Sequence, residues 1–184
     1  MLSKCRNEMT FQEWSLTPVT DFCALSPFDC DEPDLNDYFQ NDCQAQQAEL
    51  LNVTYALTPC GGPFFPTALI SLSNDAIRRE KLEDGLRPTV SYPSYPAVKI
   101  GRLGVHKEFQ RDGIGTHLVN MVKTLFVTNN RTGCRFVTVD AYNQENVLNF
   151  YQKNGFDFLT DKDISKPTRA MFFDLIRVII PGIK

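Results

Sequence analysis

The alternation of apolar and polar positions divides the chain into strands first and strand-helix units later. Residues 16 to 25 contain an expected first strand, and Glu32 to Leu51 have the pattern of one or two helices. Asp34 is placed to cap the helix that starts the 32–51 segment. Val53 to Thr58 and Phe65 to Ser73 are predicted as adjacent strands. Because Pro59 to Pro63 form a turn sequence rich in glycine and proline, these two strands are expected to pair as a hairpin.

The middle of the chain is polar at first and then regains a pattern of apolar positions. Asn74 to Pro96 is polar, charged and contains prolines, which predicts a short helix plus a loop inserted between strands. Ala97 to Val105 alternates as a strand. A helix ending near Asn129 follows, because one face of it would carry Ile114, Leu118, Met121, Val122, Leu125 and Phe126.

The last third repeats the strand-helix order and then closes the sheet. Arg135 to Asp140 is predicted as a strand, and Asn143 as the cap of a helix that runs through Asn154 and stops at Gly155. Closing strands are expected at 156–159 and 169–178. Early hairpins, two strand-helix units and a terminal hairpin together predict an α+β (mixed α/β) domain with a largely antiparallel sheet.

Length and composition favour one ordinary globular domain over residues 1–184. The chain is 42% apolar and 22% charged, and we expect it to fold without disulfides or metal. Its start lacks the apolar core of a secretory signal, and no apolar run approaches the ~20 residues of a membrane span, so a cytoplasmic protein is expected. Six cysteines without a Cys-x-x-Cys spacing read as free thiols, and two histidines make a zinc site improbable.

Charge is unevenly spread along the chain. Residues 1 to 60 carry 2 basic and 10 acidic side chains, a net charge of −8. Two interpretations stay open: a solvated helical face, or an acidic rim that attracts a cationic acceptor. The overall charge does not suggest nucleic-acid binding.

A glycine-containing turn joins the predicted strand at 97–105 to the helix that follows. Gly113 and Gly115 let backbone N–H groups converge where a helix begins, and the unpaired N–H groups and dipole of a helix N-terminus favour a pyrophosphate. Competing motifs fail on spacing. No lysine follows Gly115, as a nucleotide-triphosphate loop requires, and Leu118 stands where a dinucleotide fingerprint has its third glycine.

Two blocks resemble the GNAT N-acetyltransferases. Gln110-Arg-Asp-Gly-Ile-Gly115 resembles the family's acetyl-CoA signature Gln/Arg-x-x-Gly-x-Gly/Ala, and Asn149-Phe-Tyr-Gln-Lys-Asn-Gly-Phe156 resembles its Phe-Tyr-x-x-x-Gly-Phe helix end. The order of elements agrees over roughly residues 50 to 175. The resemblance implies a mixed sheet flanked by helices and splayed between its fourth and fifth strands, with acetyl-CoA in the gap and no metal.

The resemblance also implies roles for individual residues. Tyr151 matches the tyrosine that often protonates the departing thiolate, and the backbones of Leu103 and Val105 would hold the pantetheine arm. Gln144 stands where many relatives have asparagine, so the neighbouring Asn143 is a further candidate contact. The pyrophosphate turn comprises Gln110, Arg111, Asp112, Gly113, Ile114, Gly115 and Thr116.

The expected reaction is acetyl transfer from acetyl-CoA to a primary amine. It needs a neutral amine, a polarised carbonyl and a proton for the thiolate; the N–H of Val105 is the candidate that polarises the carbonyl. His106, Glu108 and Asp140 remain open as the general base. Because an α-amino group has a lower pKa than a lysine side chain, the lack of an obvious base favours an α-amino acceptor.

The acceptor stays open among three hypotheses. Residues 25–39 and 95–105 resemble the GNAT branch that contains toxins of toxin-antitoxin pairs, which acetylate aminoacyl-tRNA and are neutralised by a ribbon-helix-helix antitoxin. The alternatives are a small-molecule or protein amine, and an acyl-CoA-binding module without turnover. A homodimer is compatible with the fold. A basic face for tRNA would be formed by Arg78, Arg79, Lys81, Arg87, Lys99, Arg102 and Lys107.

Overall fold

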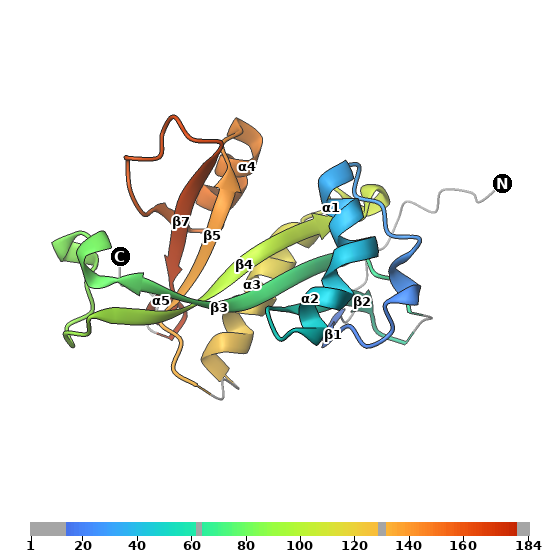
Figure 1. The fold of residues 1–184 in the computed structure, drawn as a ribbon, viewed down its shortest axis with the longest axis horizontal. Coiled ribbons are helices and arrows are strands. Elements are labelled where there is room, and N and C mark those ends of the chain that lie inside the picture. Colours follow the sequence, from blue (N-terminus) through green and yellow to red (C-terminus); the bar gives the residue numbers. More distant parts are fainter. Residues whose placement is uncertain (1–13, 62–63, 129–131, 180–184) are drawn as a thin grey trace.

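A seven-stranded mixed sheet forms the centre of the protein (Figure 1). The computed structural model describes residues 14–61, 64–128 and 132–179. All neighbouring strands are antiparallel except β4 and β5, which are parallel. In spatial order the strands are β1 (Trp14–Pro18), β2 (Val53–Pro59), β3 (Ala68–Arg78), β4 (Ser94–Val105), β5 (Phe136–Tyr142), β7 (Thr168–Asp174) and β6 (Asp157–Phe158).

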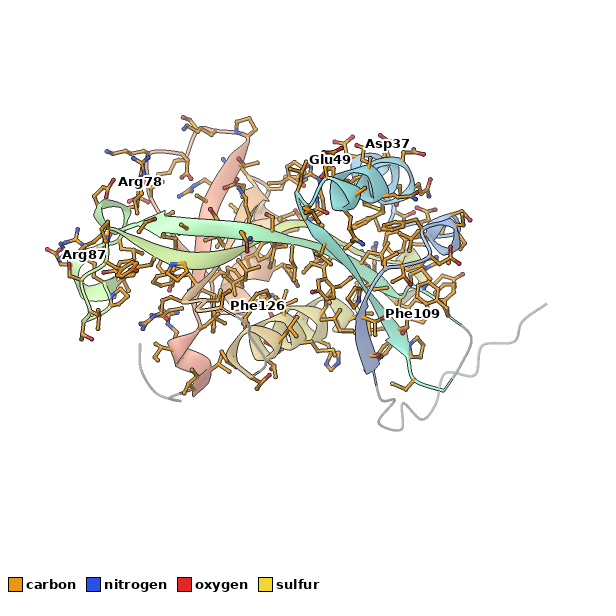
Figure 2. The ribbon with its side chains drawn as sticks, turned by 60° about the horizontal axis from the view of Figure 1, so that its bottom comes forward. Asp37, Glu49, Arg78, Arg87, Phe109 and Phe126 are labelled. Carbon is orange, nitrogen blue, oxygen red and sulfur yellow. The ribbon has the colours of Figure 1, made fainter. Side chains whose placement is uncertain are left out.

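Helices lie on both faces of this sheet. The long helix α3 covers one face, and the α1–α2 segment covers part of the other (Figures 1 and 2). Neighbouring residues of a strand point to opposite faces, so Leu57 and Ile70 pack in the core under α3, whereas Ala56 and Leu69 pack under α1–α2. The helices are α1 (Pro33–Asp37), a π-helical turn (Tyr38–Asp42), α2 (Cys43–Ala48), α3 (Ile114–Thr128), α4 (Glu145–Lys153) and α5 (Ile176–Ile179).

The parallel strands β4 and β5 separate halfway along their length. They pair only from Ala97 opposite Phe136 to Ile100 opposite Val139. Beyond that point β4 stays bonded to β3 as far as Val105, and β5 stays bonded to β7 as far as Tyr142. The predicted α+β fold with a sheet splayed between its fourth and fifth strands is therefore confirmed.

A β-bulge marks the point of separation. Ser71 of β3 pairs with Arg102 and the next residue, Leu72, pairs with Ile100, so Gly101 is the extra residue on β4. A Cβ atom at Gly101 would lie 2.9 Å from the Ser71 side-chain oxygen. Glycine thus allows the bulge without a clash, whereas a larger residue would have to move the Ser71 hydroxyl.

Several predicted boundaries are wrong for identifiable reasons. The 74–96 segment is not a helix and loop: β3 continues through Arg78, β4 already begins at Ser94, and two short 3-10 turns (Arg79–Lys81 and Asp84–Leu86) lie between them. Leu82 of this excursion joins a third apolar cluster with Tyr95 and Phe172. Long-range pairing with a neighbouring strand overrides the polar local sequence.

Two predicted helix caps and one strand end are also corrected. Helix α1 starts one residue before Asp34, with Glu32 at its N-cap, and α4 starts after Gln144, so Asn143 caps nothing. The last strand ends at Asp174 and α5 follows. Gly155 does stop α4 in the left-handed region, at φ 80°.

The described residues contain neither a helix able to cross a membrane nor a disulfide. Across 14–61, 64–128 and 132–179, no helix combines the length and apolar character that crossing a membrane requires. The five cysteines in these ranges are free thiols, and Cys5 lies outside them.

The contact between β4 and the N-terminal segment gives a stability prediction. A Cβ at Gly104 would lie 3.2 Å from the Phe28 ring and 3.3 Å from the Cys30 sulfur, both fully packed. Gly104→Val should therefore lower the free energy of unfolding by about 1–3 kcal/mol through overpacking. Gly85→Ala, with nothing within 4 Å of its Cβ, is the matched control. Equal urea-unfolding curves for both variants would contradict the packing described for Gly104.

Candidate active site

A cleft of about 770 Å³ opens where β4 and β5 part. Its walls come from β4, β5, α1, α4 and the turn before α3. Because β5 no longer pairs with β4 after Ile100, alternate residues of β4 direct backbone N–H and C=O groups into the cleft. Leu103 and Val105, the predicted pantetheine contacts, lie on this unpaired stretch and line the cleft.

The predicted pyrophosphate turn forms one end of the cleft. Arg111 and Gly113 have φ angles of 70° and 80°, so the chain turns in the left-handed region twice before α3 begins at Ile114. The N–H of His117 bonds to the carbonyl of Gly113, which leaves the earlier N–H groups of the first turn without helical partners. These groups and the helix dipole suit a phosphate.

Gly115 lets this turn approach the rest of the cleft. A Cβ there would lie 3.2 Å from the Phe150 ring of α4 and 3.6 Å from Val105 of β4. The start of α3 is therefore packed against both walls at once. A larger residue would push α4 away from the turn.

The side chain of Gln110 links the turn to two other segments. Its side-chain amide donates to the carbonyl of Val105 at 3.1 Å and to that of Cys30 at 2.8 Å. One residue thereby joins the turn, the end of β4 and the N-terminal segment. Its amide is engaged within the protein, and the residue also lines the cleft.

The other predicted contacts in the turn differ in their surroundings. Ile114 is buried in the core under α3, and the Thr116 hydroxyl lies 3.3 Å from the side-chain amide of Asn154. Arg111 and Asp112 are exposed. The sequence motif therefore combines residues that build the turn with residues that present backbone groups.

Asn143 has a different place from the one predicted. Its side-chain amide donates to the carbonyls of Ile164 and Lys166, at 2.8 and 2.9 Å, and so holds the excursion between β6 and β7. Gln144 and Asn146 line the cleft instead. The side chain of Asn143 is thus occupied by a structural role.

Tyr151 lies on α4 and lines the cleft, although it is only 6% exposed. Its ring packs edge-on against Phe150, at 5.0 Å between centroids, and against Phe156, at 5.3 Å. Burial raises the pKa of the Tyr151 phenol well above its usual range. The phenol therefore stays protonated at all ordinary pH values and can donate a proton or a hydrogen bond.

Of the three candidate bases, one lies in the cleft. Asp140, near the end of β5, lines it and forms an ion pair with Lys99 of β4. His106 is 6% exposed and sits among the rings of Phe28, Phe65 and Phe109, with its Nδ1 accepting the N–H of Glu108. His106 thus has a structural environment, away from the reacting centre.

The α1 wall gives the cleft an acidic mouth. Glu32 and Asp34 line it, so two of the ten acidic residues of the first third lie at the site. Opposite them, the Arg102 guanidinium lies 5.2 Å from the centre of the Tyr38 ring. No salt bridge to Arg102 is found among the described residues, whereas Lys99 is paired. The sequence pattern did not indicate that Arg102 meets the Tyr38 ring or that Lys99 pairs with Asp140.

The seven basic residues predicted to form one face do not lie together: only Lys99 and Arg102 are on β4, and the other five lie beyond its two ends. Arg78 and Arg87 lie at one end of the molecule, and the acidic Asp37 and Glu49 lie far from them (Figure 2). Lys107 follows the opposite end of β4 and is paired with Asp29 at 2.7 Å. Because β4 runs between Arg78 and Lys107, the length of this strand separates the two residues by about 35 Å.

Comparisons with known proteins agree with this geometry. The profile of the family described as "Acetyltransferase (GNAT) domain" matches residues 83–157, which include the turn, Asp140 and Tyr151. No curated protein sequence matches the chain. The family match confirms the predicted class of enzyme and its acetyl-CoA cosubstrate.

Solved structures match the fold over most of the chain. A tyrosine-to-phenylalanine mutant of KacT is 24% identical with a TM-score of 0.76, covering 91% of this chain and 98% of that one. AtaT complexed with acetyl-methionyl-tRNAfMet is 22% identical with a TM-score of 0.74, over 91% and 98%. AtaTR bound with AcCoA is 22% identical with a TM-score of 0.72, over 90% and 96%.

The turn yields a binding prediction. Gly115→Val should weaken acetyl-CoA binding at least about 10-fold, because the new side chain displaces Phe150 and widens the anion site. Isothermal titration calorimetry measures the change. Gly133→Ala, whose Cβ meets nothing within 4 Å, should keep the wild-type dissociation constant. Unchanged affinity in Gly115→Val would remove the turn from the cofactor site.

Proposed function

We propose that this protein, whose residues 83–157 belong to the GNAT acetyltransferases, moves the acetyl group of acetyl-CoA to the α-amino group of an aminoacyl-tRNA. One observation supports the cofactor half of this proposal most directly. The anion-binding turn, the unpaired edge of β4 and a protonated phenol meet in a single cleft. Together these groups can hold the cofactor, polarise its carbonyl and supply a proton to the departing sulfur, which are functions that acetyl transfer from a thioester uses.

The bonds change in a simple order. The neutral amine forms a new N–C bond to the acetyl carbon, the C–S bond breaks, one proton leaves the nitrogen and one arrives at the sulfur. A backbone N–H of β4, Val105 in our proposal, polarises the carbonyl oxygen. In this proposal Tyr151 supplies the proton to sulfur, and Asp140, which lines the cleft, receives the proton from nitrogen.

The acid-base groups of the cleft suit an α-amino acceptor. An α-amino group has a pKa near ~8, so a useful fraction is neutral at pH 7, whereas a lysine side chain near ~10.4 needs a strong base. The described cleft offers Asp140, already paired with Lys99. Such a carboxylate can accept a proton from a weakly basic amine far more readily than from a lysine.

Charges in the cleft favour an acceptor of mixed sign. Glu32 and Asp34 at the mouth attract an ammonium group, while the exposed guanidinium of Arg102 can contact a phosphate. An aminoacyl-tRNA end carries both groups. The neighbour AtaT, solved with acetyl-methionyl-tRNAfMet, shares the fold over 91% of this chain.

The proposed activity on aminoacyl-tRNA also implies a protein partner. We propose that the protein acts in the cytoplasm as the toxin of a toxin-antitoxin pair, with a ribbon-helix-helix protein as its antitoxin. AtaT has been solved with the C-terminus of the antitoxin AtaR, which supports such a pairing. A homodimer also belongs to this proposal.

A second acceptor class has support of its own. The acidic mouth and the net charge of −8 over residues 1–60 also suit a cationic small molecule or protein amine. An acyl-CoA-binding module without turnover is the third reading. One experiment separates the three readings, because the first two give different products and the third gives none.

We expect purified protein with acetyl-CoA and bulk charged tRNA to yield acetylated aminoacyl-tRNA. Mass spectrometry of nuclease-released aminoacyl-adenosine reads the product, and an amine panel of polyamines and lysine peptides runs in parallel. Acetylated panel members with unmodified aminoacyl-tRNA would replace our proposal with the second acceptor class. Cofactor binding without any product would favour the non-catalytic reading.

Replacing the phenol tests the proton donor. Tyr151→Phe should lower kcat by about 10²–10⁴-fold, because the departing thiolate loses its general acid. Acetyl-CoA affinity should change little, since Phe150 and Phe156 still pack against the ring. Tyr142→Phe, at another tyrosine that lines the cleft, is the control. Near wild-type kcat in Tyr151→Phe would assign the proton to another group.

A further inference from the structure

A lysine is buried beneath the end of the helix that carries Tyr151. Lys123 of α3 is 6% exposed, and its ammonium lies 3.9 Å from the centre of the Phe173 ring and 5.6 Å from that of Phe156. Lysine is almost never fully buried unless its ammonium group has partners, because desolvating its charge is costly. Neither the cofactor turn nor the proposed proton transfers account for it.

The hydrogen bonds of Lys123 lead to the cap of α4. Its Nζ donates to the carbonyl of Asn154 at 2.6 Å, with Asn120 Oδ1 at 3.5 Å. Asn154 is the C-cap of α4, and its N–H donates to the Tyr151 carbonyl at 3.0 Å. A cation at this position also complements the negative end of the helix dipole.

The same cap touches the cofactor turn. The side-chain amide of Asn154 donates to the Phe150 carbonyl at 2.8 Å and reaches the Thr116 hydroxyl at 3.3 Å. Lys123, Asn154 and Thr116 thus form one polar chain. It joins the first turn of α3, where pyrophosphate is expected, to the last turn of α4, where Tyr151 lies.

We propose that Lys123 is a positioning residue: by holding the Asn154 carbonyl, its ammonium fixes the end of α4 and thereby places the Tyr151 phenol relative to the cofactor turn. This inference rests on the proposed role of Tyr151 as proton donor. It does not depend on which amine is the acceptor.

The surroundings of Lys123 make its charge sensitive to pH. Burial, and secondarily the nearby Arg177 of α5, lower the pKa of Lys123 to about 8. Arg177 itself pairs with Asp157 of β6 and donates to the Gly155 carbonyl. No salt bridge to Lys123 is found among the described residues, so no carboxylate holds its proton.

The direction of the stability effect follows from linkage. The lowered pKa means that the folded state binds this proton less tightly than the unfolded chain, whose lysine pKa is ~10.4. The penalty is complete below about pH 8 and disappears as pH rises toward ~10.4. Stability from this group therefore increases with pH over that window, while the cation that anchors α4 is lost.

The decisive experiment uses the wild-type chain first. In protein labelled with ¹³C on its tyrosine rings, the Tyr151 signal, assigned by its loss in Tyr151→Phe, should shift with a midpoint near about pH 8. The raised pKa of Tyr151 keeps the phenol itself from titrating there. In Lys123→Met the shift should vanish, and in Lys153→Met, at an exposed lysine on α4, it should remain.

Kinetics completes the test with charged tRNA as acceptor. Lys123→Met should lower kcat about 10-fold, with the acetyl-CoA dissociation constant within about 3-fold of wild type. Its melting temperature should stay near the wild-type value, because losing the buried charge offsets the lost hydrogen bond. A Tyr151 signal that does not move near pH 8, or equal losses of kcat, affinity and melting temperature, would overturn the inference. Absent turnover with an intact titration would contradict only the proposed function.

Discussion

The separation of β4 from β5 is the constraint on which the rest of this protein depends. Two parallel strands that stop pairing in mid-sheet leave backbone donors and acceptors exposed, and such groups are costly when they are buried without partners. The structure supports each strand from its other side, β4 by β3 and β5 by β7. The cleft edge of β4 is therefore held in place by β3 while it still directs backbone groups toward the cleft. An extended ligand with amide groups can bind such an edge.

The two walls of the cleft divide the chemistry between them. The α3–α4 wall holds the turn proposed to bind pyrophosphate and a phenol that stays protonated. The α1 wall and the exposed side of β4 hold the charged residues Glu32, Asp34 and Arg102. If the first wall holds the cofactor as proposed, we expect differences in acceptor to arise from the second. Glu32 and Asp34 are then the acidic residues of the first third that bear on specificity.

Local signals in the sequence predicted the glycine turns around the candidate site better than they predicted the fold boundaries. Gly113, Gly115 and Gly155 could be read in advance, because a left-handed turn or a close approach allows few other residues. The continuation of β3 to Arg78 could not, since it depends on pairing with β4. The sequence did not indicate the surroundings of Lys123 and Arg102 either. A helical or strand pattern does not say which distant ring or carbonyl a cation will meet.

The buried state of Tyr151 sets a condition on the transfer step. Its raised pKa makes the phenol a weaker acid than in water, while a thiol near ~8.5 accepts a proton only moderately well. The same burial that disfavours a phenolate also disfavours a thiolate, so the difference between the two pKa values decides the transfer, and neither value alone does. A fixed distance between phenol and sulfur then matters most, because a hydrogen bond formed as the C–S bond breaks stabilises the developing charge. This is why the polar chain from Thr116 through Asn154 to Lys123, which ties the turn to α4, has a place in the chemistry of the site.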